Sequence, residues 1–97
     1  MKLRFTTRAA QDLAAIADYV RARNPAAASH VRAAILHALE NLVLFPRVGR
    51  AQAVKGVRKL VTRKYSYLVY YSVDDAGDEI VILTIQHPVR EREHEDV

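Results

Sequence analysis

The sequence contains no cysteine, so neither a disulfide framework nor a thiolate site can contribute to its fold. It also lacks any run of about 20 apolar residues, the length that a membrane-spanning helix needs. The first stretch, residues 1–11, has no apolar segment of the kind that follows the basic residues of a secretory signal. We therefore expect a cytoplasmic protein that does not associate with membranes.

Patterns for cofactor binding and hydrolysis are absent as well. The sequence has no glycine-rich phosphate loop and no zinc-binding pattern. His30 and His37 stand seven positions apart, whereas two ligands on one helix face favour a spacing of four. Ser66 and Ser72 have no candidate base near them in the sequence. No cofactor, metal site or hydrolase triad is therefore expected.

Acidic residues are missing from one long window, between Glu40 and Asp74. The whole chain has a net charge of +4 and a pI near 9.7. Such a basic stripe attracts an anionic partner, either nucleic acid or an acidic protein, although a solvated basic loop gives the same pattern. Its Lys and Arg residues are Arg47, Arg50, Lys55, Arg58, Lys59, Arg63 and Lys64.

What the sequence does contain is enough apolar residues for one small domain. Its 97 residues are 51% apolar, and a second core would leave each half too small. Thr6 or Thr7 is placed to cap a first helix over residues 8–23. Asn24 and Pro25 predict the cap and first position of a second, alanine-rich helix. The expected apolar side of that helix consists of Val31, Ile35, Ala38, Leu39, Leu42 and Phe45.

The second half of the chain predicts three β-strands, and residues 2–6 predict a short first one. Residues 65–73 and 79–86 are mostly β-branched or aromatic, and the turn around Gly77 joins them as a hairpin. Both faces of this hairpin are apolar, which is typical of a sheet covered on both sides. The sequence therefore predicts an α+β fold with an N-terminal helical hairpin on one face of a small antiparallel sheet of three to four strands.

Nothing in the chain remains to cover the other face of that sheet. Residues 91–97 are charged and predict a loose tail after a single domain. An apolar face of this size rarely stays exposed, so we expect it to be an oligomer contact or a partner-binding surface.

Four short motifs follow one another along the chain: NPAAA at 24–28, FPRVGR at 45–50, VRKL at 57–60 and HPVR at 87–90. In this order and spacing they resemble the RelE/ParE superfamily of bacterial toxins from type II toxin–antitoxin pairs. The resemblance extends from Phe5 to about Arg92. It implies two helices packed on an antiparallel sheet. It also implies a cognate antitoxin that wraps over the exposed sheet face to form a hetero-oligomer.

The superfamily has two branches with different targets. One branch cleaves messenger RNA on the ribosome with basic residues on the sheet, and resemblance to it would make Arg58, His87 and Arg90 the catalytic set. Leu60 and Tyr67 stand where that branch has a lysine and an arginine. The ParE-like branch inhibits DNA gyrase by protein contact and lacks the catalytic set. The sequence is more similar to this branch, so gyrase inhibition is predicted ahead of RNA cleavage.

Several residues have a structural interpretation beside the functional one. His87 is also compatible with a hydrogen-bonded residue at a strand end, and two of the tyrosines with the core. A non-toxic basic domain that binds nucleic acid or forms a homodimer is a third hypothesis. The residues predicted to bind a partner are Arg58, Leu60, Tyr65, Tyr67, Val69, Tyr71 and Arg90.

Overall fold

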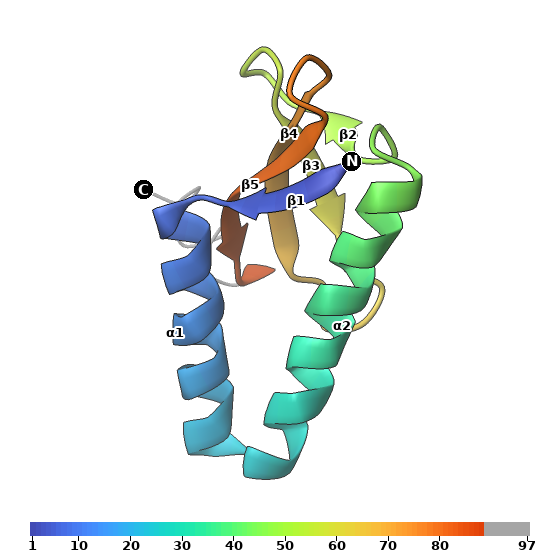
Figure 1. Ribbon diagram of the computed structural model, residues 1–97. Helices are drawn as coiled ribbons and strands as arrows, with labels where there is room; N and C mark the ends of the chain where they lie inside the picture. The colour runs from blue at the N-terminus through green and yellow to red at the C-terminus, as the bar shows by residue number, and fades with distance from the viewer. Residues whose placement is uncertain (89–97) are drawn as a thin grey trace.

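The computed structural model describes residues 1–88, which form two long helices and a five-stranded sheet (Figure 1). The helices meet at their connection and spread apart toward the sheet, so that the pair has the outline of a V (Figure 1). The predicted α+β fold with a helical hairpin is confirmed. The elements are β1 (Lys2–Phe5), α1 (Thr7–Arg23), α2 (Pro25–Leu44), β2 (Arg50–Ala51), β3 (Arg58–Val61), β4 (Leu68–Asp74) and β5 (Glu79–Gln86).

Both helices begin where local capping chemistry predicts. The Thr6 hydroxyl accepts a hydrogen bond from the Ala9 amide at 3.0 Å, which satisfies one free donor of the first turn of α1. Asn24 ends α1 and also caps α2, accepting from the Ala27 amide at 3.3 Å. Pro25 occupies the first turn, where its missing N–H costs nothing. These short-range signals confirm the expected break between the helices.

The sheet has the order β1-β5-β4-β3-β2 and is mixed, not purely antiparallel. β1 runs parallel to β5, with Lys2 opposite Glu79 and Phe5 opposite Ile82, whereas all the other pairs are antiparallel. The predicted antiparallel sheet of three to four strands is wrong in both respects. Parallel pairing needs a long connection, and here both helices and three strands separate the two partners.

The core lies between the helices and one face of the sheet. On β4 and the residue before it, Tyr67, Val69 and Tyr71 point to this side and are buried. They join Ile35, Leu39 and Leu42 of α2 in one buried cluster. The helical hairpin thus covers the face that carries Tyr67 and Tyr71.

The opposite face of the sheet is not the open apolar surface that the sequence predicted. Leu68 and Val81 are buried, and Tyr70 and Leu83 are half-buried. Val61, opposite Leu68, is the large apolar residue on this face that stays exposed. Most of the exposed large apolar side chains in residues 1–88 therefore lie elsewhere on the molecule.

Two segments differ from the expected elements. β4 begins at Leu68, because Tyr65 and Ser66 have φ angles of 68° and 55° and form a turn after β3. The Thr62 hydroxyl holds this turn: it donates to the Lys64 carbonyl at 2.6 Å and accepts from the Tyr67 amide at 3.0 Å. Phe45, predicted on the apolar side of α2, is the residue that ends the helix and points into solvent.

Candidate functional site

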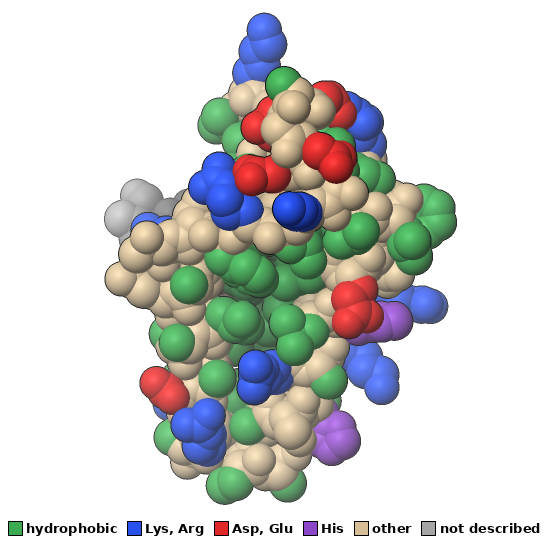
Figure 2. Space-filling view, viewed as in Figure 1, with side chains coloured by type: hydrophobic (Ala, Val, Ile, Leu, Met, Phe, Trp, Pro, Cys, Tyr) green, Lys and Arg blue, Asp and Glu red, His purple; other side chains and the backbone are tan. Residues whose placement is uncertain are grey.

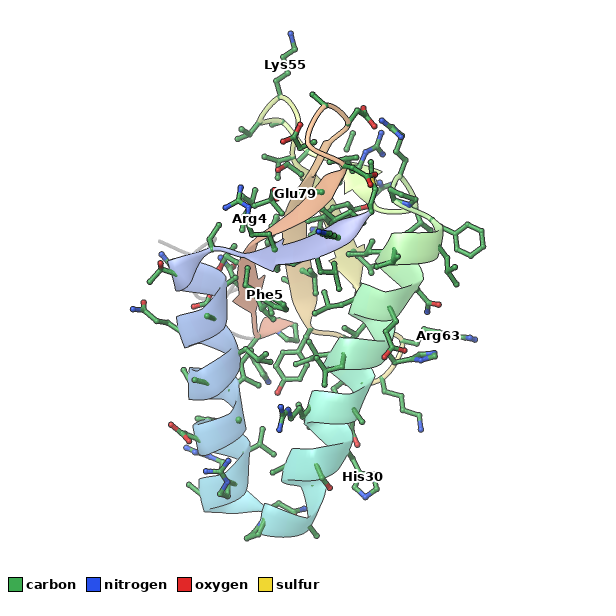
Figure 3. All side chains as sticks on the ribbon, viewed as in Figure 1. Arg4, Phe5, His30, Lys55, Arg63 and Glu79 are labelled. Atoms are coloured by element: carbon green, nitrogen blue, oxygen red, sulfur yellow. The ribbon has the colours of Figure 1, made fainter. Side chains whose placement is uncertain are left out.

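A groove runs between α1 and α2, with a volume of about 880 Å³. Figure 2 shows apolar side chains in the hollow between the two helices, and Figure 3 shows Phe5 at its sheet end. The alanines of both helices make the hollow, because small side chains leave the space between the diverging helices unfilled. The lining residues are Phe5, Ala10, Leu13, Ala14, Ala17, Arg21, Pro25, Ala28, Ser29, Arg32, Ala33 and Leu36.

Positive charge accompanies this groove. Arg21 pairs with the exposed carboxylate of Asp18 at 3.3 Å, a surface contact that contributes little to stability. Arg32, on the other wall, takes part in none of the ion pairs formed within residues 1–88. The groove thus combines an apolar floor with two arginines, which suits an amphipathic segment that carries acidic residues.

This groove was not predicted from the sequence, although the sequence contains a signal for it. Ala10, Ala14 and Ala17 follow a spacing of four and three, so they form a second stripe on α1 beside the core stripe. Alanine at these positions is compatible with a helix that packs closely against a neighbour. The sequence does not say that the neighbouring helix would diverge and leave the stripe open.

The basic stripe does not form one patch. Lys55 lies at the tip of the β2–β3 connection and Arg63 in the β3–β4 turn, at opposite ends of β3 (Figure 3). Arg47 pairs with Asp75 at 2.6 Å, and the Lys59 ammonium lies 5.9 Å from the Tyr70 ring centroid. The basic side chains of this stripe are therefore spread over the described surface, and their role in binding an anionic partner stays a prediction. Arg50 and Lys64, also predicted members, are exposed and take part in none of the ion pairs within residues 1–88.

Arg58 binds the backbone of its own chain. One guanidinium nitrogen donates to the carbonyls of Gly49 at 2.8 Å and Arg47 at 3.2 Å. Opposite Arg58 in the sheet, the Tyr71 hydroxyl accepts from the Gly49 amide at 2.9 Å. Burial raises the pKa of Tyr71, and its bond to Gly49 and the charge of Arg58 offset part of that rise. Arg58 and Tyr71 together fix the segment that follows α2.

Four other predicted partner-binding residues are not on an open surface. Leu60 is half-buried against the core, and Tyr67, Val69 and Tyr71 are buried within it. In the chain alone α1 and α2 cover the sheet face that carries these residues, so a partner contact through them stays a prediction without support from their exposure. Tyr65 is the exception, since it is 47% exposed in the β3–β4 turn.

His87 lies in an aromatic cluster between the sheet and α1. Its ring meets the Tyr67 ring edge-on at 5.3 Å and lies 6.5 Å from the Tyr19 ring, which the Arg23 guanidinium covers at 3.6 Å. Arg90, the third member of the predicted catalytic set, is outside the described residues, as is the expected tail 91–97.

The strand register keeps Arg58 and His87 apart. Arg58 pairs with Tyr71, whereas His87 follows Gln86, which pairs with Leu68. Three residues of β4 separate these positions, which corresponds to about 10 Å along the strand. Within residues 1–88 the two candidates therefore do not form an acid–base pair around one reacting atom.

No group of three or more His, Cys, Asp or Glu side chains in residues 1–88 is placed to hold a metal ion. Neither described helix is long and apolar enough to cross a membrane.

Comparisons with known proteins agree on one family. The family model described as ParE toxin of type II toxin–antitoxin system, parDE, matches residues 3–91. A curated protein of Sinorhizobium fredii, named "Putative toxin Y4kP", is 33% identical over 86 residues, which make up 89% of this chain and 86% of that protein.

Solved structures give the same fold. A chain of the structure described as the chromosomal ParDE TA system from P. aeruginosa has a TM-score of 0.77 at 32% identity, covering 90% of this chain and 95% of that chain. A chain of the intact E. coli RelBE toxin–antitoxin complex has a TM-score of 0.66 at 20% identity, covering 87% of this chain and 92% of that chain. At 20% identity the second match shows the fold alone.

Proposed function

We propose that this chain, which belongs to the family of ParE toxins of type II toxin–antitoxin systems, inhibits DNA gyrase by protein contact. A cognate antitoxin neutralises it in a toxin–antitoxin hetero-oligomer. When the antitoxin is lost, the free toxin inhibits gyrase in the cytoplasm and growth stops. This arrest would serve to stabilise a plasmid or chromosomal locus that carries the pair.

The observation that supports the gyrase proposal is that Arg58 forms hydrogen bonds with the backbone of its own chain. In RNA cleavage this side chain would have to stabilise the charge that develops on a phosphate. Instead, the Arg58 guanidinium donates to the carbonyls of Arg47 and Gly49. If the guanidinium turned toward a phosphate, those two carbonyls would lose this donor. His87 is packed among aromatic rings about 10 Å or more farther along the sheet. A toxin that acts through contact needs neither residue as a catalyst.

The groove between α1 and α2 is the best site for the antitoxin. A third helix laid into the V would bury the apolar stripe of Ala10, Ala14 and Ala17, and small residues permit close approach of its backbone. Acidic side chains on that helix would meet Arg21 and Arg32. The sheet face that the sequence suggested is a poorer site, because Leu68 and Val81 are already buried there.

Parallel assays with one preparation test the choice of target. Purified protein is added to gyrase in a supercoiling assay and to ribosomes translating a defined message. We expect loss of supercoiling and intact messenger RNA. Unaffected gyrase, at a protein excess that arrests growth in cells, would remove the proposal, and cleaved message would replace it with the ribosome-dependent RNase.

A matched pair of variants on α1 tests the groove. Ala14 and Ala15 are neighbouring exposed alanines, but only Ala14 lines the groove. Ala14→Glu places a carboxylate on the apolar floor, where it would be desolvated and would repel an acidic helix. We expect antitoxin affinity to fall at least tenfold, about 1.4 kcal/mol, for Ala14→Glu, and to stay within twofold of wild type for Ala15→Glu. The measurement is calorimetric titration with the cognate antitoxin. Equal affinities of the two variants would exclude the groove as the antitoxin site.

A further inference from the structure

Large apolar side chains are exposed together at the end of α2. Leu44, Phe45 and Val48 are 70%, 63% and 58% exposed. Figure 2 shows apolar side chains on the surface over this end of the helix. Single exposed apolar residues are ordinary, but three within five positions form a patch of the kind that marks interaction sites. We call Leu44, Phe45 and Val48 the α2 corner.

The backbone of the α2 corner is a closed turn. The Phe45 amide donates to the Asn41 carbonyl at 2.9 Å, which ends the helix, and the Val48 amide donates to the Phe45 carbonyl at 3.1 Å. Pro46 and Arg47 are the central residues of that turn, and the proline ring fixes φ at the position where such turns favour it. Phe45 and Val48 are therefore held at the two ends of one short loop.

Residues of β3 and β4 hold this turn in place through hydrogen bonds. Gly49 donates its amide to the buried Tyr71 hydroxyl, and Arg58 binds the carbonyls of Arg47 and Gly49. A Cβ atom at Gly49 would lie 2.6 Å from the Tyr71 hydroxyl oxygen, so only glycine allows this close approach. A braced loop loses little conformational entropy on binding, which is the property of an effective anchor.

The surroundings of the α2 corner are basic. Arg50 is exposed and takes part in none of the ion pairs within residues 1–88. Arg47 pairs with Asp75, but both side chains are more than half exposed, at 56% and 67%, so a partner can replace that contact at little cost. The matching surface is an apolar pocket that takes Phe45 and Val48 and is bordered by acidic side chains.

We propose that the α2 corner is the surface through which this toxin holds its target protein, an inference that rests on the proposed function. The antitoxin groove is a separate surface. Leu36, the last groove residue on α2, lies eight positions before Leu44, about 12 Å along the helix. The target and the antitoxin therefore recognise different residues of the toxin, but the two surfaces are close enough for a bound antitoxin to block a large target protein.

Substitution of the exposed anchors tests the proposal without disturbing the core. The variants are Phe45→Ala and the double variant Phe45→Ala/Val48→Ala. The matched control is Val54→Ala, which truncates a similarly exposed valine, 67%, in the β2–β3 connection. All three variants should keep the thermal midpoint of the wild type within about 2 °C, because exposed substitutions change stability little.

Two activities are then measured: the toxin concentration that halves gyrase supercoiling, and growth arrest on induction at equal soluble levels. We expect Phe45→Ala to raise the half-inhibitory concentration about 30-fold, as for a central interface residue, and the double variant to abolish arrest. Val54→Ala should behave as wild type in both assays. Antitoxin affinity should stay within twofold for every variant.

The outcomes separate this inference from the proposed function. If wild type inhibits gyrase and the double variant inhibits it equally, the α2 corner is not the target surface, while gyrase inhibition stands. If wild type leaves gyrase unaffected but arrests growth and the double variant does not, the gyrase proposal fails and the α2 corner remains the target surface. Loss of antitoxin binding, or dissociation of a toxin dimer in the double variant, would assign the surface to those partners and overturn the proposal.

Discussion

Replacing Tyr71 by Phe removes one hydroxyl from the centre of the structure and nothing else. Tyr71 is fully buried, and its hydroxyl oxygen accepts the Gly49 amide at 2.9 Å. The phenyl ring keeps its place in the core, so no cavity larger than the lost oxygen is expected. The Gly49 amide, itself on a buried residue, is left without its acceptor.

The expected cost follows from that orphaned donor. A buried N–H that loses its only acceptor costs about 1–3 kcal/mol. At the middle of that range, about 2 kcal/mol, the thermal midpoint of a domain of this size should fall by roughly 8–16 °C. The α2 corner should also loosen, because one of its two braces is gone.

Urea denaturation and thermal melting of the two proteins at neutral pH measure this cost. Tyr65→Phe is the matched control, since it removes a tyrosine hydroxyl from an exposed turn and should change the free energy of unfolding by less than about 0.5 kcal/mol. If Tyr71→Phe is as stable as Tyr65→Phe, the hydroxyl does not hold the segment after α2 and the reasoning about the brace is wrong.

Four further predictions concern the same framework. Burial raises the pKa of Tyr71 above the unfolded value of 10.0, so its protonated form stabilises the fold fully below pH 10 and less as pH rises further. Denaturation at pH 8 and pH 11 should therefore show that wild type loses its stability advantage over Tyr71→Phe at the higher pH. Thr62→Ala removes both hydroxyl bonds of the β3–β4 turn and should cost about 1–3 kcal/mol in urea denaturation, whereas Thr62→Ser should recover most of it. Asp12→Ala, which removes the acceptor of the Thr84 hydroxyl and the Ile85 amide, should cost a similar amount and increase hydrogen exchange at Ile85. Tyr65→Asn with Ser66→Gly should raise stability by about 1 kcal/mol, because Asn-Gly suits two consecutive positive φ angles; no gain in thermal midpoint would contradict this.

Local chemistry made much of the fold predictable. Thr6, Asn24 and Pro25 act on residues within one helical turn of themselves, so the helix boundaries could be inferred without knowing what the helices pack against. The β4–β5 hairpin is similarly local, since Gly77 and its neighbours lie between two strands of strong β character. These features depend on contacts that are close in sequence.

Two of the errors involve contacts between distant segments, and one is local. The parallel pairing of β1 with β5 joins residues more than 70 positions apart, and no short-range pattern specifies it. Alternation put Tyr67, Val69 and Tyr71 on one face, but with both faces apolar it could not say which face the helices would cover. The β3–β4 turn was missed because Tyr65 and Ser66 occupy positions that usually require glycine or asparagine.

The candidate site was less predictable than the fold. The sequence shows that Arg58 is charged, but its acceptors are backbone carbonyls, which no residue pattern reveals. The groove depends on how far two helices diverge, and the α2 corner on a helix that ends one residue before Phe45. In each case the residue types were visible and their exposure was not.

Reversible contact with gyrase, relieved by contact with an antitoxin, is the proposed mode of action of this toxin. The most direct measurement is gyrase supercoiling at a fixed inhibitory concentration of the protein while its antitoxin is added in increasing molar ratio. We expect supercoiling to be lost without antitoxin and to return fully near one antitoxin per toxin. Supercoiling that stays at the level of untreated gyrase, with or without antitoxin, would contradict it.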